Sequence, residues 1–164
     1  MSCGFETTGT AKRMVEFKTL TYESVTVGEE FTSDDFLIKP EDVDTYAYAV
    51  DDHHPWYFED SPFGGRIAHP TLMANQALLM RHSRYIVPAG LHAKMQFEFV
   101  EPLRAGMRVR TRGKVIDKYE RRERCYMVTE FETRDEESGA VLVRGQFTQM
   151  IFPASGVHRE TTNR

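Results

Sequence analysis

Alternating hydrophobic and polar residues dominate the second half of the chain. In the run Leu91–Phe99 every odd position is apolar, and the same period of two marks residues 107–115, 125–133 and 141–151, where Gln149 is the exception. Segments rich in turn-forming or charged residues separate these runs, at 101–106, 118–123 and 135–139. Because a period of two is typical of strands that bury one face, the pattern predicts an antiparallel meander of four strands.

A helical pattern precedes these strands. From Thr71 the chain is apolar around most of a helix circumference and contains no Gly or Pro; the apolar positions are Leu72, Met73, Ala77, Leu78, Leu79 and Met80. A helix of that kind must be buried, and the apolar face of the meander needs a cover. We therefore predict an α+β fold in which a curved antiparallel sheet wraps around one long central helix.

The segment before the helix divides into three parts. Residues 27–38 predict a turn and a short strand, and Pro40 followed by apolar residues at 43, 46, 47 and 50 predicts a short amphipathic helix. Residues 51–67 contain Pro55, Pro62 and the pair Gly64-Gly65, which predict a long loop. Since this loop carries aromatic and titratable side chains, it is the candidate functional segment. We expect a single domain over residues 18–153, with flexible tails at 1–17 and 154–164.

Composition narrows the class of protein. The chain has 164 residues, of which 40% are hydrophobic and 28% charged, as expected of a soluble globular domain. The net charge of −4 argues against nucleic acid as a partner. No apolar run is long enough to cross a bilayer and the first residues lack a secretory signal, so we expect a cytoplasmic protein without membrane contact. Cys3 and Cys125 have neither disulfide nor zinc-site spacing and are expected to be free thiols.

Three segments in a fixed order carry a resemblance to a known family. They read Asp52-His53-His54-Pro55-Trp56-Tyr57, then Phe63-Gly64-Gly65, then Ile67-Ala68-His69-Pro70-Thr71-Leu72. This order resembles the MaoC-like and (R)-specific enoyl-CoA hydratases, which have Asp-x-Asn-Pro-[Leu/Ile]-His, a Phe-Gly turn and Ile-[Ala/Val]-His-Gly-Met-Leu. Similarity extends from Val27 to Phe152 and implies a hotdog fold. It also implies hydration or dehydration at the 2,3 position of an acyl thioester on coenzyme A or acyl carrier protein.

The resemblance assigns roles to single positions and also shows departures. Asp52 matches the catalytic aspartate of the family, but Tyr57 occupies the position of its catalytic histidine. His54 replaces the asparagine before the proline, and Asn75 stands where many members have serine. Pro70 replaces a glycine whose backbone amide is expected to bind the thioester oxygen, and proline has no amide hydrogen.

Hydration of an enoyl thioester requires a base for water, an acid for the α-carbon and a donor for the carbonyl oxygen. Tyr57 is a weak base because a phenol has a pKa of about 10, whereas His53 and His54 titrate in the useful range. We therefore predict Asp52, His54 and Tyr57 as catalytic residues. The predicted substrate-binding residues are His53, His69, Asn75, Trp56, Phe63 and Gly64.

Simpler interpretations stay open beside these. Asp52 sits in a sequence typical of a turn, His69 can cap the central helix, and Trp56 and Tyr57 can close the core. Adjacent histidines without a third ligand do not make a metal site, so we expect no metal and no cofactor other than the thioester substrate.

Three functions and one kind of assembly remain as hypotheses. A hydratase or dehydratase leads; a non-catalytic hotdog subunit that binds acyl thioesters or pairs with a catalytic partner is the second, and an acyl-CoA thioesterase the third. Edge strands of a hotdog sheet favour association, so we expect a homodimer or higher assembly, or a hetero-oligomer.

Overall fold

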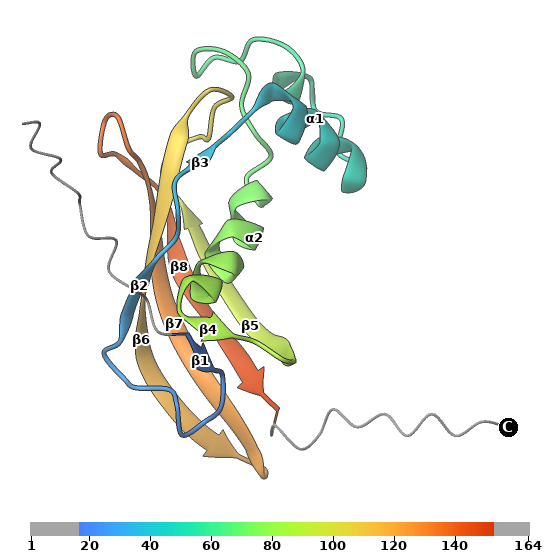
Figure 1. Ribbon diagram of the computed structural model, residues 1–164. Helices are drawn as coiled ribbons and strands as arrows, with labels where there is room; N and C mark the ends of the chain where they lie inside the picture. The colour runs from blue at the N-terminus through green and yellow to red at the C-terminus, as the bar shows by residue number, and fades with distance from the viewer. Residues whose placement is uncertain (1–16, 153–164) are drawn as a thin grey trace, which may run out of the picture.

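A computed structural model describes residues 17–152, apart from the side chains of Asn75 and Gln76; the predicted tails and Cys3 lie outside these residues. Figure 1 shows the order of the elements along the chain. The elements are β1 (Lys18–Thr19), β2 (Glu30–Thr32), β3 (Phe36–Leu37), α1 (Pro40–Ala49), the 3-10 helix η1 (Pro55–Tyr57), α2 (Leu72–Leu79), the 3-10 helix η2 (Met80–Ser83), β4 (Tyr85–Ile86), β5 (Gly90–Phe99), β6 (Arg108–Arg121), β7 (Arg124–Asp135) and β8 (Val141–Ile151).

The four long strands lie where the alternating pattern predicted them, but their order in the sheet differs. The sheet runs β2-β6-β7-β8-β5, and β3 also pairs with β6. Strands β6, β7 and β8 form a meander, whereas β5 pairs with β8 from Gly90↔Ile151 to Phe99↔Val143. The predicted four-strand meander is therefore wrong at its first strand. A period of two shows which side chains share a face, but it does not show which strands are neighbours.

One predicted turn is also shorter than expected. Residues 118–121 continue β6, and only Arg122 and Glu123 separate β6 from β7. Both residues have positive φ, 51° and 60°, which gives the tight two-residue hairpin that suits twisted strands. The charged residues around this turn belong to an exposed hairpin and not to a loop.

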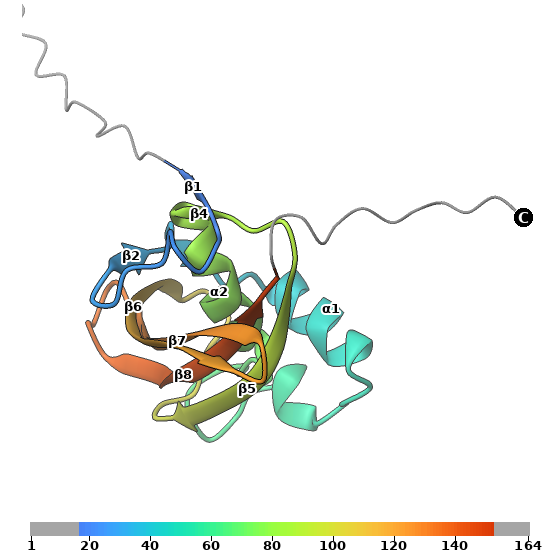
Figure 2. The same cartoon turned by 90° about the horizontal axis from the view of Figure 1, so that it is seen from below.

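The helix α2 lies against the concave face of the sheet, which curls around it in the view from below (Figure 2). Met73 and Ala77 of α2 and Met80 of η2 are buried, as are Val109 and Phe147 on the facing strands. The predicted cover of the sheet is thus confirmed, but the predicted long helix only in part. The α-helix has 8 residues, and the four residues of η2 continue it as a tighter 3-10 turn.

A β-bulge changes the face that the first long strand presents. The register between β5 and β8 shifts between His92 and Lys94, so His92 lies opposite Gln149 and Met95 opposite Phe147. Directly opposed residues lie on the same face of a sheet, so His92 lies on the inner face. The alternation had predicted Leu91 at this place on the inner face. The apolar side chains of β5 are also not buried as expected: Leu91 is 54% and Met95 36% exposed.

The largely buried carboxylate of Glu29 links the N-terminal segment to the rest of the fold. Glu29 accepts hydrogen bonds from Lys18 Nζ at 3.2 Å, from Arg84 Nε at 2.8 Å and from the Tyr85 hydroxyl. Burial raises the pKa of Glu29, but the three hydrogen bonds outweigh burial and hold this pKa below its ordinary value. The contacts join β1, β4 and the start of β2.

Two further observations concern the described residues. Between residues 17 and 152 no helix is both long and apolar enough to cross a membrane. Cys125 is a free, partly buried thiol at the start of β7, and burial raises its pKa.

Candidate functional site

The carboxylate of Asp52 is positioned by the end of α1. Asp51 adopts a left-handed conformation with φ of 55°, which reverses the chain and which aspartate tolerates better than most residues. The backbone amide of Asp52 then donates to Ala47 O at 3.0 Å, and its Oδ1 accepts from the backbone amide of His54 at 3.2 Å. The side chain is still 43% exposed, so the carboxylate is accessible to water.

Tyr57 approaches the same carboxylate from η1. Its hydroxyl donates to Asp52 Oδ2 at 3.3 Å, and the residue is only 7% exposed. Burial raises the pKa of Tyr57, and the negative charge of Asp52 raises it further. Tyr57 is therefore protonated near neutral pH and acts as a hydrogen-bond donor to Asp52, not as a base.

His69 supplies an imidazole to Asp52 from just before α2. Its Nε2 lies 3.4 Å from Asp52 Oδ2, and its side chain is 18% exposed. On the other side of the ring, Nδ1 accepts from the backbone amide of Thr71 at 3.2 Å and lies 2.8 Å from Thr71 Oγ1. Because Nδ1 accepts from a backbone N–H, the neutral ring carries its proton on Nε2 and directs it at Asp52.

Two residues that the sequence reasoning did not select extend this network. The hydroxyl of Tyr46 in α1 lies 3.1 Å from Thr71 O and 2.9 Å from Thr71 Oγ1. The rings of Tyr46 and Tyr57 each lie 5.5 Å from the ring of His69. The two tyrosines enclose the imidazole, and Thr71 fixes its orientation. A tyrosine on a predicted helix face gives no signal of this role, because its ring satisfies the apolar pattern by itself.

The other two candidate histidines are engaged elsewhere. His54 Nδ1 accepts from the backbone amide of Trp56 at 3.3 Å and so caps η1. His53 Nδ1 lies 3.7 Å from Asp51 Oδ1, and its ring stacks on Phe58. Within the described residues, neither of these imidazoles has a hydrogen bond to Asp52.

The remaining predicted residues shape the loop. Trp56 packs edge-on against Phe63, with ring centroids 5.6 Å apart, and Phe63 is 49% exposed. Gly64 and Gly65 have φ of 85° and 90°, which allow the tight turn closed by Ser61 N to Gly65 O at 3.0 Å. Asn75 lies in α2, but its side chain is outside the described part of the chain.

The start of α2 offers no free backbone amide over residues 70–72. Pro70 has no N–H, the amide of Thr71 donates to His69 Nδ1, and the amide of Leu72 donates to His69 O at 2.9 Å. The backbone amides of residues 70–72 are therefore not available to a thioester oxygen, and its hydrogen-bond donor must come from another group.

The donor set at Asp52 suits proton transfer better than metal binding. Across residues 17–152, no group of three or more His, Cys, Asp or Glu side chains lies close enough together to hold a metal ion. A solvent-accessible carboxylate, held by a tyrosine hydroxyl and by the imidazole of His69, can take a proton from a water molecule and return it.

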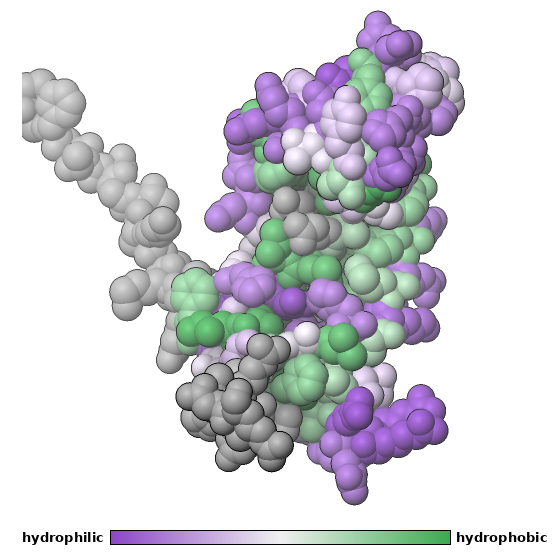
Figure 3. Space-filling model, turned by 90° about the vertical axis from the view of Figure 1, so that its right-hand side faces the viewer, coloured by the Kyte–Doolittle hydropathy of each residue, from purple (hydrophilic) through white to green (hydrophobic). Residues whose placement is uncertain are grey.

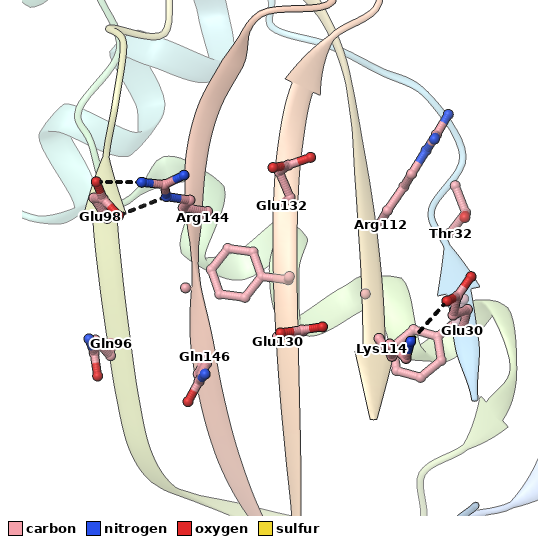
Figure 4. A pocket seen from close by; sticks show the side chains of 14 residues that line it. Glu30, Thr32, Gln96, Glu98, Arg112, Lys114, Glu130, Glu132, Arg144 and Gln146 are labelled. Carbon is pink, nitrogen blue, oxygen red and sulfur yellow. Dashed lines mark hydrogen bonds and ion pairs between the residues drawn. The ribbon is translucent and has the colours of Figure 1, made fainter. Parts of the chain in front are cut away.

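A polar hollow of about 680 Å³ lies away from this site, on the sheet face opposite α2 (Figure 4). Ion pairs across neighbouring strands line it. Arg144 Nε donates to Glu98 at 2.7 Å, and Lys114 Nζ lies 3.4 Å from Glu30. On the outer side of β6, Arg108 and Arg110 pair with Asp35 as well, so the charges that alternate along this strand are explained by a solvated surface without a ligand.

Comparison with known proteins adds to this geometry. Residues 25–144 match the family described as "FAS1-like, dehydratase domain region". No curated protein matches the chain by sequence.

Several solved structures share the fold. The MaoC-like dehydratase from Rhodospirillum rubrum superposes with a TM-score of 0.69 at 19% identity, over 81% of this chain and 97% of that one. The R-hydratase PhaJ1 from Pseudomonas aeruginosa gives 0.68 at 18% identity, over 80% and 84%. The HadBC (3R-hydroxyacyl-ACP dehydratase) complex from Mycobacterium tuberculosis gives 0.66 at 21% identity, over 76% and 96%. The expected hotdog fold is confirmed.

Proposed function

The chain belongs to the FAS1-like dehydratase-region family, and from this membership we propose that it adds or removes water at the 2,3 position of an acyl thioester. The acyl group is carried on coenzyme A or on acyl carrier protein. The observation that carries the proposal is the pair formed by Asp52 and His69, whose Oδ2 and Nε2 lie 3.4 Å apart.

In the proposed hydration, Asp52 is the group that moves the proton. Its carboxylate takes a proton from water as the water oxygen bonds to C3, and the electron pair of the double bond moves toward C2 and the thioester carbonyl. The protonated Asp52 then delivers this proton to C2, so that one molecule of water has been added and Asp52 is regenerated. Dehydration is the same sequence in reverse.

His69 and Tyr57 position Asp52 in this proposal. Both donate toward Oδ2, which leaves Oδ1 to face the water; among residues 17–152, Oδ1 accepts a hydrogen bond from the backbone amide of His54 at 3.2 Å and from no other group. The third requirement, a donor to the carbonyl oxygen, is not met by a backbone amide at residue 70, because that residue is proline.

The test is hydration of trans-2-enoyl-CoA substrates of several chain lengths by the purified full chain, followed by loss of the enoyl absorbance and by release of free thiol. We expect loss of enoyl absorbance without thiol release. Thiol release would indicate a thioesterase, in which Asp52 activates water for attack on the carbonyl carbon. No turnover by a correctly folded protein contradicts the proposed activity of the isolated chain.

The blocked start of α2 favours one alternative function, a non-catalytic hotdog subunit. Neither Pro70 nor the amide of Thr71 can donate to a thioester oxygen, and such a chain would bind acyl thioesters or pair with a catalytic partner. Copurification with a second hotdog chain, with turnover only in the mixture, would support this alternative.

We also propose that the chain assembles through β5 and works as a homodimer or larger hotdog assembly in the cytoplasm, with residues 18–153 as its single domain. Strand β5 is an edge of the sheet, and hydrophobic side chains gather on the side of the molecule where it lies (Figure 3). Leu91, Met95 and Phe99 of this strand are exposed by 54%, 36% and 45%. An apolar edge strand of ten residues invites pairing with a second chain.

A further inference from the structure

A second group of polar side chains lies at the far end of α2, on the inner side of the sheet. Gln149 of β8 is fully buried, and neither its Oε1 nor its Nε2 has a hydrogen-bond partner among the described residues. Arg81 of η2 is 7% exposed, and its Nε also has no partner there. Gln149 is the residue that breaks the apolar alternation of the last strand. Buried polar atoms are nearly always paired, so these three orphaned atoms require an explanation.

The bulge in β5 brings a third residue to this place. His92 lies directly opposite Gln149, and its Nε2 lies 3.3 Å from Arg81 Nη1. The amide of Gln149 lies over the neighbouring Gly90, where an added Cβ would stand 2.1 Å from Gln149 Nε2. Arg81, His92 and Gln149 therefore converge from η2, β5 and β8.

The charge of this group is not balanced. Among residues 17–152, no carboxylate forms an ion pair with Arg81. His92 is an exposed residue of the edge strand, but its Nε2 accepts from the guanidinium and is therefore unprotonated. Partial loss of hydration at the ring lowers the pKa of His92, and the charge of Arg81 lowers it further. The same two causes lower the pKa of the adjacent His82. On the opposite sheet face, by contrast, Arg144 is paired with Glu98 (Figure 4). A buried guanidinium without a counter-ion is unfavourable, which points to an anion that binds there.

We propose that Arg81, His92 and Gln149 form a binding site for a carboxylate at the far end of the substrate's acyl chain. This inference rests on the proposed function. The site lies on the inner side of the sheet next to α2, the helix that begins just after His69. The 8 residues of α2 and the first two residues of η2 separate the two places by ~16 Å at 1.5 Å per residue in the α-helix and about 2.0 Å per residue in the 3-10 helix, a span that an extended long acyl chain covers.

The donors of this site fit a carboxylate better than an alkyl end. Arg81 Nε and Gln149 Nε2 are unsatisfied donors, and a guanidinium binds a carboxylate with two parallel N–H groups. The carboxylate pairs these two donors but not Gln149 Oε1, which is an acceptor. A methyl group in the same place would leave these donors unpaired, and sites built to hydrogen-bond a substrate group strongly reject the analogue that lacks it. The proposed substrates are thus thioesters of dicarboxylic acids.

The kinetic test compares two series of trans-2-enoyl-CoA substrates of matched length, one ending in a methyl group and one in a carboxylate. We expect the wild-type protein to favour the carboxylate series by about tenfold or more in kcat/KM, which corresponds to one charge-assisted interaction. Arg81→Met should remove this preference. Arg144→Met, which removes an exposed and paired arginine from the other sheet face, is the matched control and should leave the preference unchanged.

A binding measurement separates this inference from the proposed activity. Calorimetry with the CoA monothioester of hexadecanedioate and with hexadecanoyl-CoA, which differ only in a carboxylate or a methyl group at the far end, should show that the wild-type protein binds the ω-carboxylate ligand more tightly. Arg81→Met and Gln149→Leu should each lose the difference. Turnover of the methyl series without a preference and without tighter binding of the ω-carboxylate ligand overturns the inference and leaves the function intact. Tighter binding of that ligand without any turnover contradicts the function but supports the site.

Stability and mass provide the check on folding. Because methionine removes an unpaired buried charge, Arg81→Met should fold with an unchanged or higher Tm. An Arg81→Met protein that loses its assembly in sedimentation, while it binds the CoA monothioester of hexadecanedioate as the wild type does, would assign Arg81 to subunit contacts and overturn the inference.

Discussion

His69 Nε2 lies 3.4 Å from Asp52 Oδ2, although the two residues stand at opposite ends of the loop that joins α1 to α2. Tyr57 stands where the similar hydratases have their catalytic histidine, and its hydroxyl donates to the same oxygen of Asp52. The carboxylate of Asp52 therefore contacts an imidazole and, in addition, a phenol. The loop brings both together because η1 and the turn at Gly64-Gly65 fold it back onto the end of α1.

The first prediction concerns the carboxylate of Asp52. Asp52→Asn should lower kcat for enoyl-CoA hydration by about 10²–10⁴-fold, the range expected for loss of a proton-transfer group. Asp51→Asn is the control, because Asp51 is the adjacent residue and its side chain is 96% exposed; this variant should keep its activity. An active Asp52→Asn protein would show that another residue moves the proton.

The second prediction distinguishes His69 from His54. His69→Gln keeps a donor near the position of Nε2, whereas His69→Asn keeps an acceptor near Nδ1 but loses the donor to Asp52. We expect His69→Asn to lower kcat by at least about tenfold more than His69→Gln. His54→Asn should change kcat little, because His54 Nδ1 caps η1 through Trp56 N and asparagine is a good cap.

The contrary result would be equally informative. If His54→Asn abolishes turnover while its Tm is unchanged, and both His69 variants are active, the imidazole that matters is His54, as the sequence suggested. The kinetic and melting measurements together separate a role in catalysis from a role in holding η1.

The sequence predicted elements better than their spatial relations. The period of two located β5 to β8 because side-chain burial alternates along each strand, but the pairing of β5 with β8 depends on a connection that carries no periodic signal. The bulge at Ala93 was equally invisible: the alternation continues through residue 91, and only the register with β8 shows that His92 turns inward. In the site, the order of the motifs along the chain was enough to identify Asp52. Which histidine contacts Asp52 depends on local hydrogen bonds, such as the one from Thr71 N to His69 Nδ1, and these give no signal in the sequence.

The third prediction concerns stability at low pH. In the folded protein the pKa of Glu29 is below its ordinary value of 4.5, so its contribution is present above that value and is lost as pH falls through the folded pKa. Glu29→Gln should lower the free energy of unfolding at pH 7 by about 3 kcal/mol, because it removes the negative charge that both Lys18 and Arg84 contact. The difference in unfolding free energy between wild type and Glu29→Gln should shrink as the pH falls below 4.5.

Denaturant unfolding at several pH values measures this effect. Glu30→Gln is the control, since Glu30 adjoins Glu29 but its side chain is 74% exposed; its unfolding free energy should stay within about 0.5 kcal/mol of wild type. A deficit in Glu29→Gln that is constant from pH 7 to pH 3 would mean that the loss comes from packing and not from the charge.

The fourth prediction concerns assembly through β5. Met95 is 36% exposed although it belongs to the inner, apolar series of this edge strand, while its neighbour Gln96 points to the polar outer face. Met95→Lys should shift the sedimentation mass toward the monomer, because a charge on the contact surface is unfavourable and lysine on an edge strand opposes pairing. Gln96→Lys adds the same charge to the same strand on the other face and should leave the mass unchanged. If the wild-type chain is monomeric at micromolar concentration, the exposed face of β5 needs another explanation; if both variants dissociate, the contact depends on the net charge of the strand and not on its apolar side.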